Sequence, residues 1–176
     1  MPLNQAPLLI IAVGNRSRGD DAIGPLLLEQ LQQAEGLNTD VEFLEDFQLQ
    51  VEHALDLKSR YGVLFIDAAL PDVVNAVTLE PIASNQDVLL TSHSLRAETV
   101  LHVSTTVNGY EPPSWQLAIE GQCFDLGEGV SDAGRQHMQQ AFKLATRWLA
   151  DRRRELATPD NAKSGFTTES KETSLA

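Results

Sequence analysis

The chain has 176 residues, of which 42% are hydrophobic, and a formal net charge of −12 at pH 7. This length and apolar content are sufficient for one domain with a buried core. The acidic balance argues against nucleic acid and anionic membranes as partners, because both bind clustered Lys and Arg side chains.

The cysteine content and the N-terminus narrow the cellular setting. Cys123 is the single cysteine of the sequence, which excludes an intrachain disulfide and a zinc site built from cysteines. The N-terminus lacks a basic segment, and the apolar run that follows is too short for a signal sequence or a membrane span. We therefore expect a cytoplasmic protein with no membrane partner.

The first predicted elements are a strand and a helix joined by a short polar loop. Leu8–Val13 is a continuous apolar run, which is typical of a strand buried on both faces. The helix begins near Asp21 or at Pro25, since proline is tolerated in a first turn. Its predicted apolar face consists of Ile23, Leu27, Leu31 and Ala34.

Strands and helices alternate along the remaining sequence. Strands are predicted at Val41–Phe47, Gly62–Ala68, Asn75–Leu79 and Trp115–Ile119, with Gln122–Leu126 as a further strand beside the last. Helices are predicted at Val51–Lys58, at Leu95–Val103, and from an N-cap at Ser131 to about Arg154.

This alternation predicts the α/β class: a three-layer sandwich with a mostly parallel, twisted sheet and helices on both faces. Residues 1–156 are expected to form the single domain. Residues 157–176 are polar and poor in bulky side chains, which predicts a disordered tail.

The loop after the first strand carries the most informative residues. Gly14 and Gly19 have the spacing of a phosphate-binding P-loop. A P-loop, however, needs a lysine and a hydroxyl residue where this chain has Asp20 and Asp21. Two carboxylates repel a phosphate and attract a cation, so the loop is expected to face a metal or another positive group.

Three candidate site residues lie near the ends of predicted strands, where doubly wound sheets bind their ligands. Asp21 follows the first strand, Asp67 ends the strand Gly62–Ala68, and His93 precedes the next helix. Two carboxylates and an imidazole suit a divalent metal. Each residue also has a purely structural interpretation as a helix cap, a turn former or an ordinary loop histidine, so the argument rests on their convergence.

Other titratable residues are interpreted as structural. His53, His102 and His137 fall in predicted helices without paired ligand spacing, and Cys123 is assigned to the core. The run Arg152–Arg154 is interpreted as a solvated helix end that complements the helix dipole. The sequence contains neither the HExxH signature of zinc peptidases nor the GxSxG signature of serine hydrolases.

Four segments together resemble the [NiFe]-hydrogenase maturation endopeptidases, over roughly residues 8–150: GNRSRGDDAIG, FIDA, SHS and CFDLGEGVS. The resemblance implies an α/β sandwich with a mainly parallel sheet. It also implies an enzyme that removes a short C-terminal extension from the hydrogenase large-subunit precursor after nickel insertion. Two longer segments, EDFQLQVEHALDL and PPSWQLAIEGQCFDLGEGVS, resemble the branch that serves soluble NAD(P)-coupled hydrogenases.

The family's metal-contacting positions correspond to Asp21, Asp67 and His93, which the resemblance also makes the catalytic candidates. Asp20 matches an accompanying acid with a supporting role. The family's loop frame corresponds to Gly14, Asn15 and Gly24. The resemblance implies nickel as the recognition element carried by the substrate, not as a resident cofactor. Either a carboxylate would act as general base toward water, or the nickel would polarise the scissile carbonyl.

Two other functions remain open on the sequence. One is a self-contained metallohydrolase in which the same residues hold zinc or manganese permanently. The other is a non-catalytic checkpoint that binds the nickel-loaded precursor without cutting it. In the main interpretation the precursor is the protein partner, and the chain itself is expected to be a monomer.

Overall fold

The computed structural model describes residues 5–85 and 95–158. Within them one five-stranded sheet has the order β2-β1-β3-β5-β4. Its strands are β1 (Leu8–Val13), β2 (Val41–Asp46), β3 (Gly62–Ala69), β4 (Val77–Ile82) and β5 (Ser114–Glu120). The first four strands in this spatial order are mutually parallel, and only β4 runs antiparallel to its neighbour β5.

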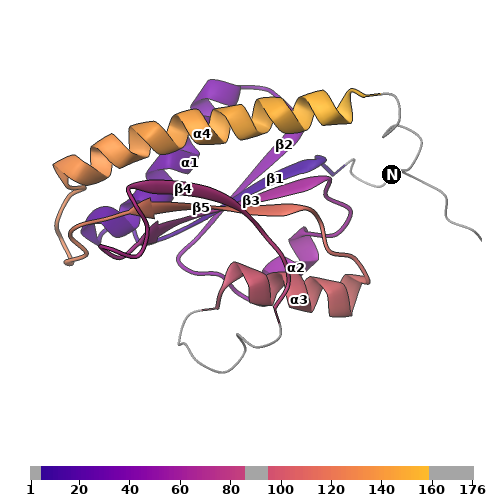
Figure 1. The fold of residues 1–176 in the computed structure, drawn as a ribbon, viewed down its shortest axis with the longest axis horizontal. Coiled ribbons are helices and arrows are strands. Elements are labelled where there is room, and N and C mark those ends of the chain that lie inside the picture. The colour runs from indigo at the N-terminus through magenta and orange to yellow at the C-terminus, as the bar shows by residue number, and fades with distance from the viewer. Residues whose placement is uncertain (1–4, 86–94, 159–176) are drawn as a thin grey trace, which may run out of the picture.

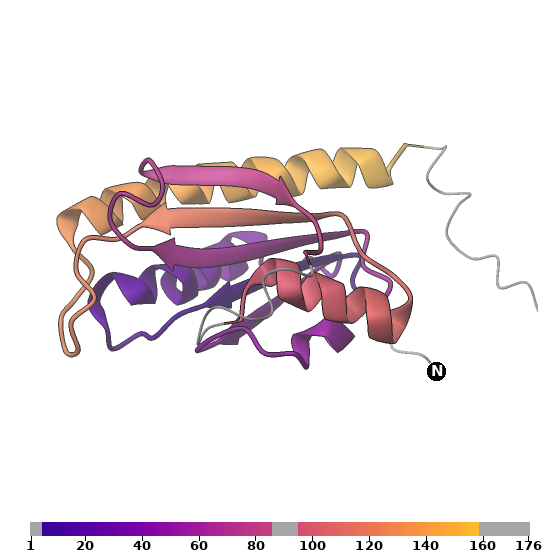
Figure 2. The ribbon, with the colours of Figure 1, turned by 60° about the horizontal axis from the view of Figure 1, so that its bottom comes forward.

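Helices cover both faces of the sheet, as the sequence predicts (Figures 1 and 2). The helices are α1 (Ile23–Glu35), α2 (His53–Asp56), α3 (Ala97–Asn108) and α4 (Asp132–Leu156). Successive residues of β1 alternate between two cores, because side chains of a strand point to opposite faces. Leu8 and Ile10 pack beneath α1 and α4, whereas Leu9 and Ile11 pack against α2 and α3. The three-layer α/β sandwich is confirmed.

Most predicted elements are present, with shifted ends. β1 has its predicted bounds, α2 is shorter than expected, and β4 begins two residues later than predicted. The predicted strand at Gln122–Leu126 is wrong. These residues form the loop between β5 and α4, and the backbone N–H groups of Gln122 and Cys123 donate to the Asp20 carboxylate instead of to a strand. Cys123 is accordingly half-buried in this loop and not a core residue.

Two predictions about helix surfaces are also wrong. Ala34 is exposed, because the buried stripe of α1 continues with i+4 spacing from Leu31 to the half-buried Glu35. The arginines near the end of α4 are not simply solvated. Arg153 binds Glu35 at 2.5 Å and Asp40 at 2.6 Å, and the Arg152 guanidinium lies 4.4 Å from the centre of the Trp115 ring.

Close packing at the start of α1 brings the acidic loop against the sheet. A 3-10 turn, Gly19–Ala22, leads into the helix. A Cβ atom at Gly24 would lie 2.5 Å from the Val13 carbonyl oxygen and 3.5 Å from that of Ile66. Only glycine permits this approach, so the turn that carries Asp21 is held near the carboxyl ends of β1 and β3.

None of the helices in residues 5–85 and 95–158 is both long and apolar enough to cross a membrane.

Candidate functional site

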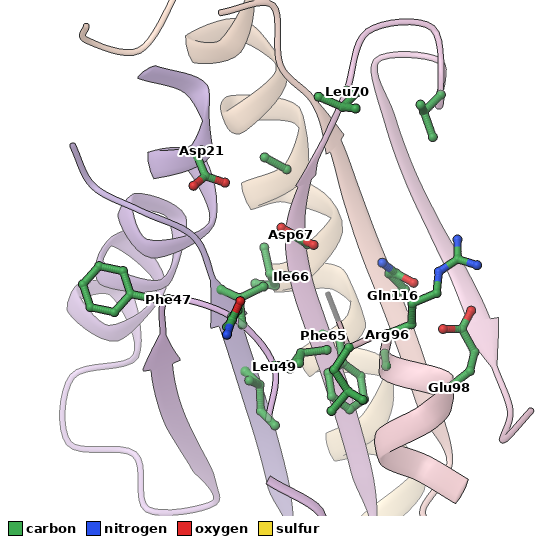
Figure 3. Close-up of a pocket in the computed structure, with 17 residues that line it drawn as sticks. Asp21, Phe47, Leu49, Phe65, Ile66, Asp67, Leu70, Arg96, Glu98 and Gln116 are labelled. Carbon is green, nitrogen blue, oxygen red and sulfur yellow. The ribbon is translucent and has the colours of Figure 1, made fainter. Parts of the chain in front are cut away.

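A pocket of about 460 Å³ opens on the α2 and α3 side of the sheet, near the carboxyl ends of β1 and β3. Asp21 and Asp67 both line it (Figure 3). In Figure 3 the polar side chains of Arg96, Glu98 and Gln116 lie across Asp67 from Phe47. The structure thus brings together two of the three residues that the sequence selects.

The loop after β1 fixes the position of Asp21. Gly14 has a φ of +147°, and a Cβ atom there would lie 2.0 Å from the Asp21 carbonyl oxygen, so this position requires glycine. The Gly14 N–H donates to the carbonyl of Asp46 at the end of β2. The next N–H, that of Asn15, donates to the Asp21 carboxylate at 2.9 Å. One carboxylate oxygen of Asp21 is therefore oriented by the backbone.

Asp67 has the most perturbed carboxyl group of the pocket. Its side chain is half-buried on β3. Burial, and secondarily the negative charge of Asp21, raise the pKa of Asp67 to about 7, although a hydrogen bond from the Ala68 backbone acts in the opposite direction. A carboxyl group with this pKa gains and loses a proton near neutral pH, as a general acid or base must.

Asp20, the other acid of the pair, has a different environment. It is fully buried. Its carboxylate accepts hydrogen bonds from the backbone N–H groups of Gln122, Cys123 and Ser131, and from the Ser131 hydroxyl at 2.7 Å. Burial acts to raise the pKa of Asp20, but these hydrogen bonds together lower it below its usual value. Asp20 thus connects the acidic turn to the loop before α4.

Ser131 confirms the predicted N-cap of α4. Its hydroxyl oxygen accepts a hydrogen bond from the Gly134 N–H at 2.9 Å while its own proton is donated to Asp20. The start of α4 and the acidic turn consequently share one hydrogen-bond network.

His93, the third candidate, lies outside the described residues. Leu95 and Arg96, which follow it in the chain, line the same pocket as Asp21 and Asp67. Within residues 5–85 and 95–158, no group of three or more His, Cys, Asp or Glu side chains is arranged to hold a metal ion.

The remaining histidines lie in helices, as predicted. His53 is buried; its Nδ1 accepts a hydrogen bond from the Gln50 N–H, and its Nε2 lies 3.3 Å from the Asp46 carboxylate. His137 Nδ1 lies 2.8 Å from the Glu120 carbonyl oxygen.

Sequence reasoning missed the polar wall of the pocket, formed by Arg96, Glu98 and Gln116. It also missed the pairing of Asp46 with His53. The end of the strand Val41–Phe47 makes Glu45 and Asp46 candidates for the lining of the ligand site, because strand ends of parallel sheets border that site, but nothing in the sequence pairs Asp46 with His53. No comparable pattern marks Arg96 or Gln116.

Comparison with known proteins gives matches among solved structures only. Neither a family model nor a curated protein sequence matches the chain significantly. The hydrogenase maturating endopeptidase HybD from E. coli superimposes with a TM-score of 0.68 at 20% sequence identity, covering 82% of this chain and 92% of that protein. The [NiFe] hydrogenase maturation protease HycI from Thermococcus kodakarensis gives a TM-score of 0.62 at 18% identity, with 82% and 93% coverage.

A third similar structure comes from another archaeon. The hydrogenase 2 maturation peptidase from a Thaumarchaeota archaeon has a TM-score of 0.58 at 18% identity, covering 81% of this chain and 97% of that one. The structural similarity extends over nearly the whole of each compared protein, so it is a similarity of whole domains and not of a single motif. The chain has the fold of the hydrogenase maturation endopeptidases.

Proposed function

We propose that this protein is an endopeptidase that removes the C-terminal extension of a nickel-loaded [NiFe]-hydrogenase large-subunit precursor. One observation carries the proposal: Asp21 and Asp67 line a single pocket. The pKa of Asp67, raised to about 7 by burial and by the charge of Asp21, agrees with a role in proton transfer. The family motifs in the sequence and the shared fold point to the same activity.

In the proposed reaction the nickel belongs to the substrate. Asp21 and Asp67 supply carboxylate oxygens that would contact nickel already held by substrate thiolates. Binding would bring the neighbouring peptide bond into the pocket. There the Asp67 oxygen that does not contact nickel would take a proton from the attacking water and pass it to the leaving amine. The oriented Asp21 carboxylate would keep its position through the Asn15 N–H.

His93 is the proposed third contact to the substrate nickel. It lies two residues before Leu95, which lines the pocket. An imidazole nitrogen and two carboxylates together would suit a divalent metal such as nickel.

The processing of a purified precursor tests the proposal. The full chain is incubated with nickel-loaded and with nickel-free precursor, and the products are separated by electrophoresis. We expect shortening of the nickel-loaded sample only. Binding of the loaded precursor without cleavage would favour the checkpoint function. Cleavage of both samples, together with stoichiometric zinc or manganese in the purified protein, would favour the self-contained metallohydrolase.

The pH dependence of cleavage provides the first quantitative prediction. Both proposed roles of Asp67, nickel contact and general base, require its ionised form. Because the pKa of Asp67 is about 7, kcat/KM should rise about tenfold per pH unit below this value and level off above it. The measurement is initial processing rates between pH 5 and 9 on precursor whose nickel content is verified at each pH. A flat profile from pH 5 to 7 would contradict the role of Asp67.

A further inference from the structure

Large apolar side chains are exposed where they border the pocket. Phe47 is 73% exposed, Leu70 62% and Val73 68%. All three line the same pocket as Asp21 and Asp67. We call Phe47, Leu70 and Val73 the apolar rim. Exposed apolar groups beside a cleft are typical of binding surfaces, because their contact with water is unfavourable until a partner covers them.

The segment that carries Phe47 is held in place by its own hydrogen bonds. The Phe47 N–H donates to the Asp46 carboxylate at 2.6 Å. The other oxygen of that carboxylate lies 3.3 Å from His53 Nε2, and the Gln50 N–H donates to His53 Nδ1 at 2.9 Å. Asp46 and the buried His53 thus fix both ends of the segment 47–50.

The segment that carries Leu70 and Val73 is fixed from the other side. The Glu120 carboxylate accepts hydrogen bonds from the backbone N–H groups of Asp72 and Ala76, each at 3.3 Å. Asp72 and Ala76 have φ values of 64° and 58°, a left-handed conformation that L-residues seldom adopt. Strained conformations of this kind persist where the surrounding structure enforces them, and they concentrate at binding sites.

We propose that the apolar rim binds the peptide segment of the precursor that adjoins the metal, and that it selects uncharged, apolar side chains there. This inference rests on the proposed function. The two acids of the pocket suit the metal of the proposed substrate, and the rim side chains Phe47, Leu70 and Val73 carry no charge that would oppose an apolar peptide beside that metal. The charged wall residues Arg96 and Glu98 lie across Asp67 from Phe47 (Figure 3). Because hydrogen bonds already fix the two segments that carry the rim, little conformational entropy of the protein is lost when a peptide binds. The rim is therefore suited to bind an extended peptide.

The test uses Phe47→Ala, Val73→Ala and the double variant in the full chain. The control is Leu37→Ala, because Leu37 is 98% exposed and lies between α1 and β2, at the opposite end of the parallel strands. KM and kcat are measured for nickel-loaded precursor, with melting temperature and elution volume as checks. We expect the double variant to raise KM at least about tenfold with kcat within about twofold, and the control to match wild type.

The outcomes separate the two levels of the proposal. If wild type processes the precursor and the double variant has the same KM, the docking role of the rim is wrong while the proposed function stands. A loss of kcat at unchanged KM in the double variant would also overturn the docking role of the rim. A change of oligomeric state in the double variant would show that a second copy of the chain covers the rim. An inactive wild type would contradict the proposed function itself.

Discussion

Replacing Asp67 by Asn should reduce kcat/KM for nickel-loaded precursor by about 100-fold or more, because an amide neither accepts the proton of water nor contacts nickel as an anion. Asn has nearly the same shape as Asp, so the pocket should keep its form. Initial rates of processing by the purified variant give the measurement. Asp132→Asn is the matched control, since the Asp132 side chain is 92% exposed at the start of α4 and does not line the pocket, and this variant should process at the wild-type rate.

The melting temperature of Asp67→Asn should differ from that of wild type in a pH-dependent way, which an unfolded or misfolded variant would not show. Above about pH 4 the unfolded chain has released the proton of Asp67, whereas the folded chain retains it up to about pH 7. The contribution of Asp67 to stability is therefore complete below about pH 4 and is lost as the pH rises toward about 7. Asp67→Asn escapes this loss, so it should melt at a higher temperature than wild type at pH 8, and the difference should vanish toward pH 4. Wild-type processing by Asp67→Asn, or equal melting temperatures at pH 8, would contradict the account of this residue.

Replacing Asp20 by Asn should lower the free energy of unfolding by about 3 kcal/mol, because hydrogen bonds to a buried charged group are strong and their donors would lose an acceptor. The Asp20 carboxylate accepts from three backbone N–H groups and one hydroxyl. An amide would turn its NH₂ group toward some of these donors. Urea unfolding at pH 7 gives the measurement.

The effect of Asp20 should also depend on pH in a defined direction. The pKa of Asp20 is lowered in the folded protein, so its ionised form stabilises the fold at neutral pH. This contribution is complete above the ordinary aspartate pKa and is lost as the pH falls through the lowered value. Asp125→Asn, which changes an exposed acid of the same loop, is the control and should alter stability by less than about 0.5 kcal/mol. An unfolding free energy of Asp20→Asn within this same limit would refute the structural role of Asp20.

The positions of Asp21 and Asp67 could be inferred from the sequence because one geometric rule connects them. Carboxyl ends of parallel strands meet at one edge of a sheet, so residues that follow or end such strands converge. β1 and β3 are indeed adjacent and parallel. The apolar runs of these two strands are continuous, so the residues at which the strands begin and end could also be predicted closely.

The different environments of Asp20 and Asp21 could not be inferred in this way. Both acids occupy one 3-10 turn, in which successive side chains point in different directions. The partners of Asp20 are Gln122, Cys123 and Ser131, more than 100 residues further along the chain. A contact at that separation depends on the folded topology, and no local pattern in the sequence encodes it.

The contacts of Arg153 and the exposure of Phe47 escaped prediction for the same reason. Arg153 lies among other arginines near a helix end, a pattern typical of a solvated surface, yet it binds Glu35 and Asp40 from another part of the chain. Phe47 is the last residue of the predicted strand Val41–Phe47, but β2 ends at Asp46 and the Phe47 ring remains outside the core. Tertiary packing decides both cases.

The intact mass of the large-subunit precursor, measured by mass spectrometry after incubation at a series of nickel occupancies, tests the central claim most directly. Nickel-gated processing predicts one product that has lost a single contiguous C-terminal peptide, in a fraction that follows the nickel occupancy. A precursor of unchanged mass at full occupancy, or cleavage that is independent of nickel, would contradict it.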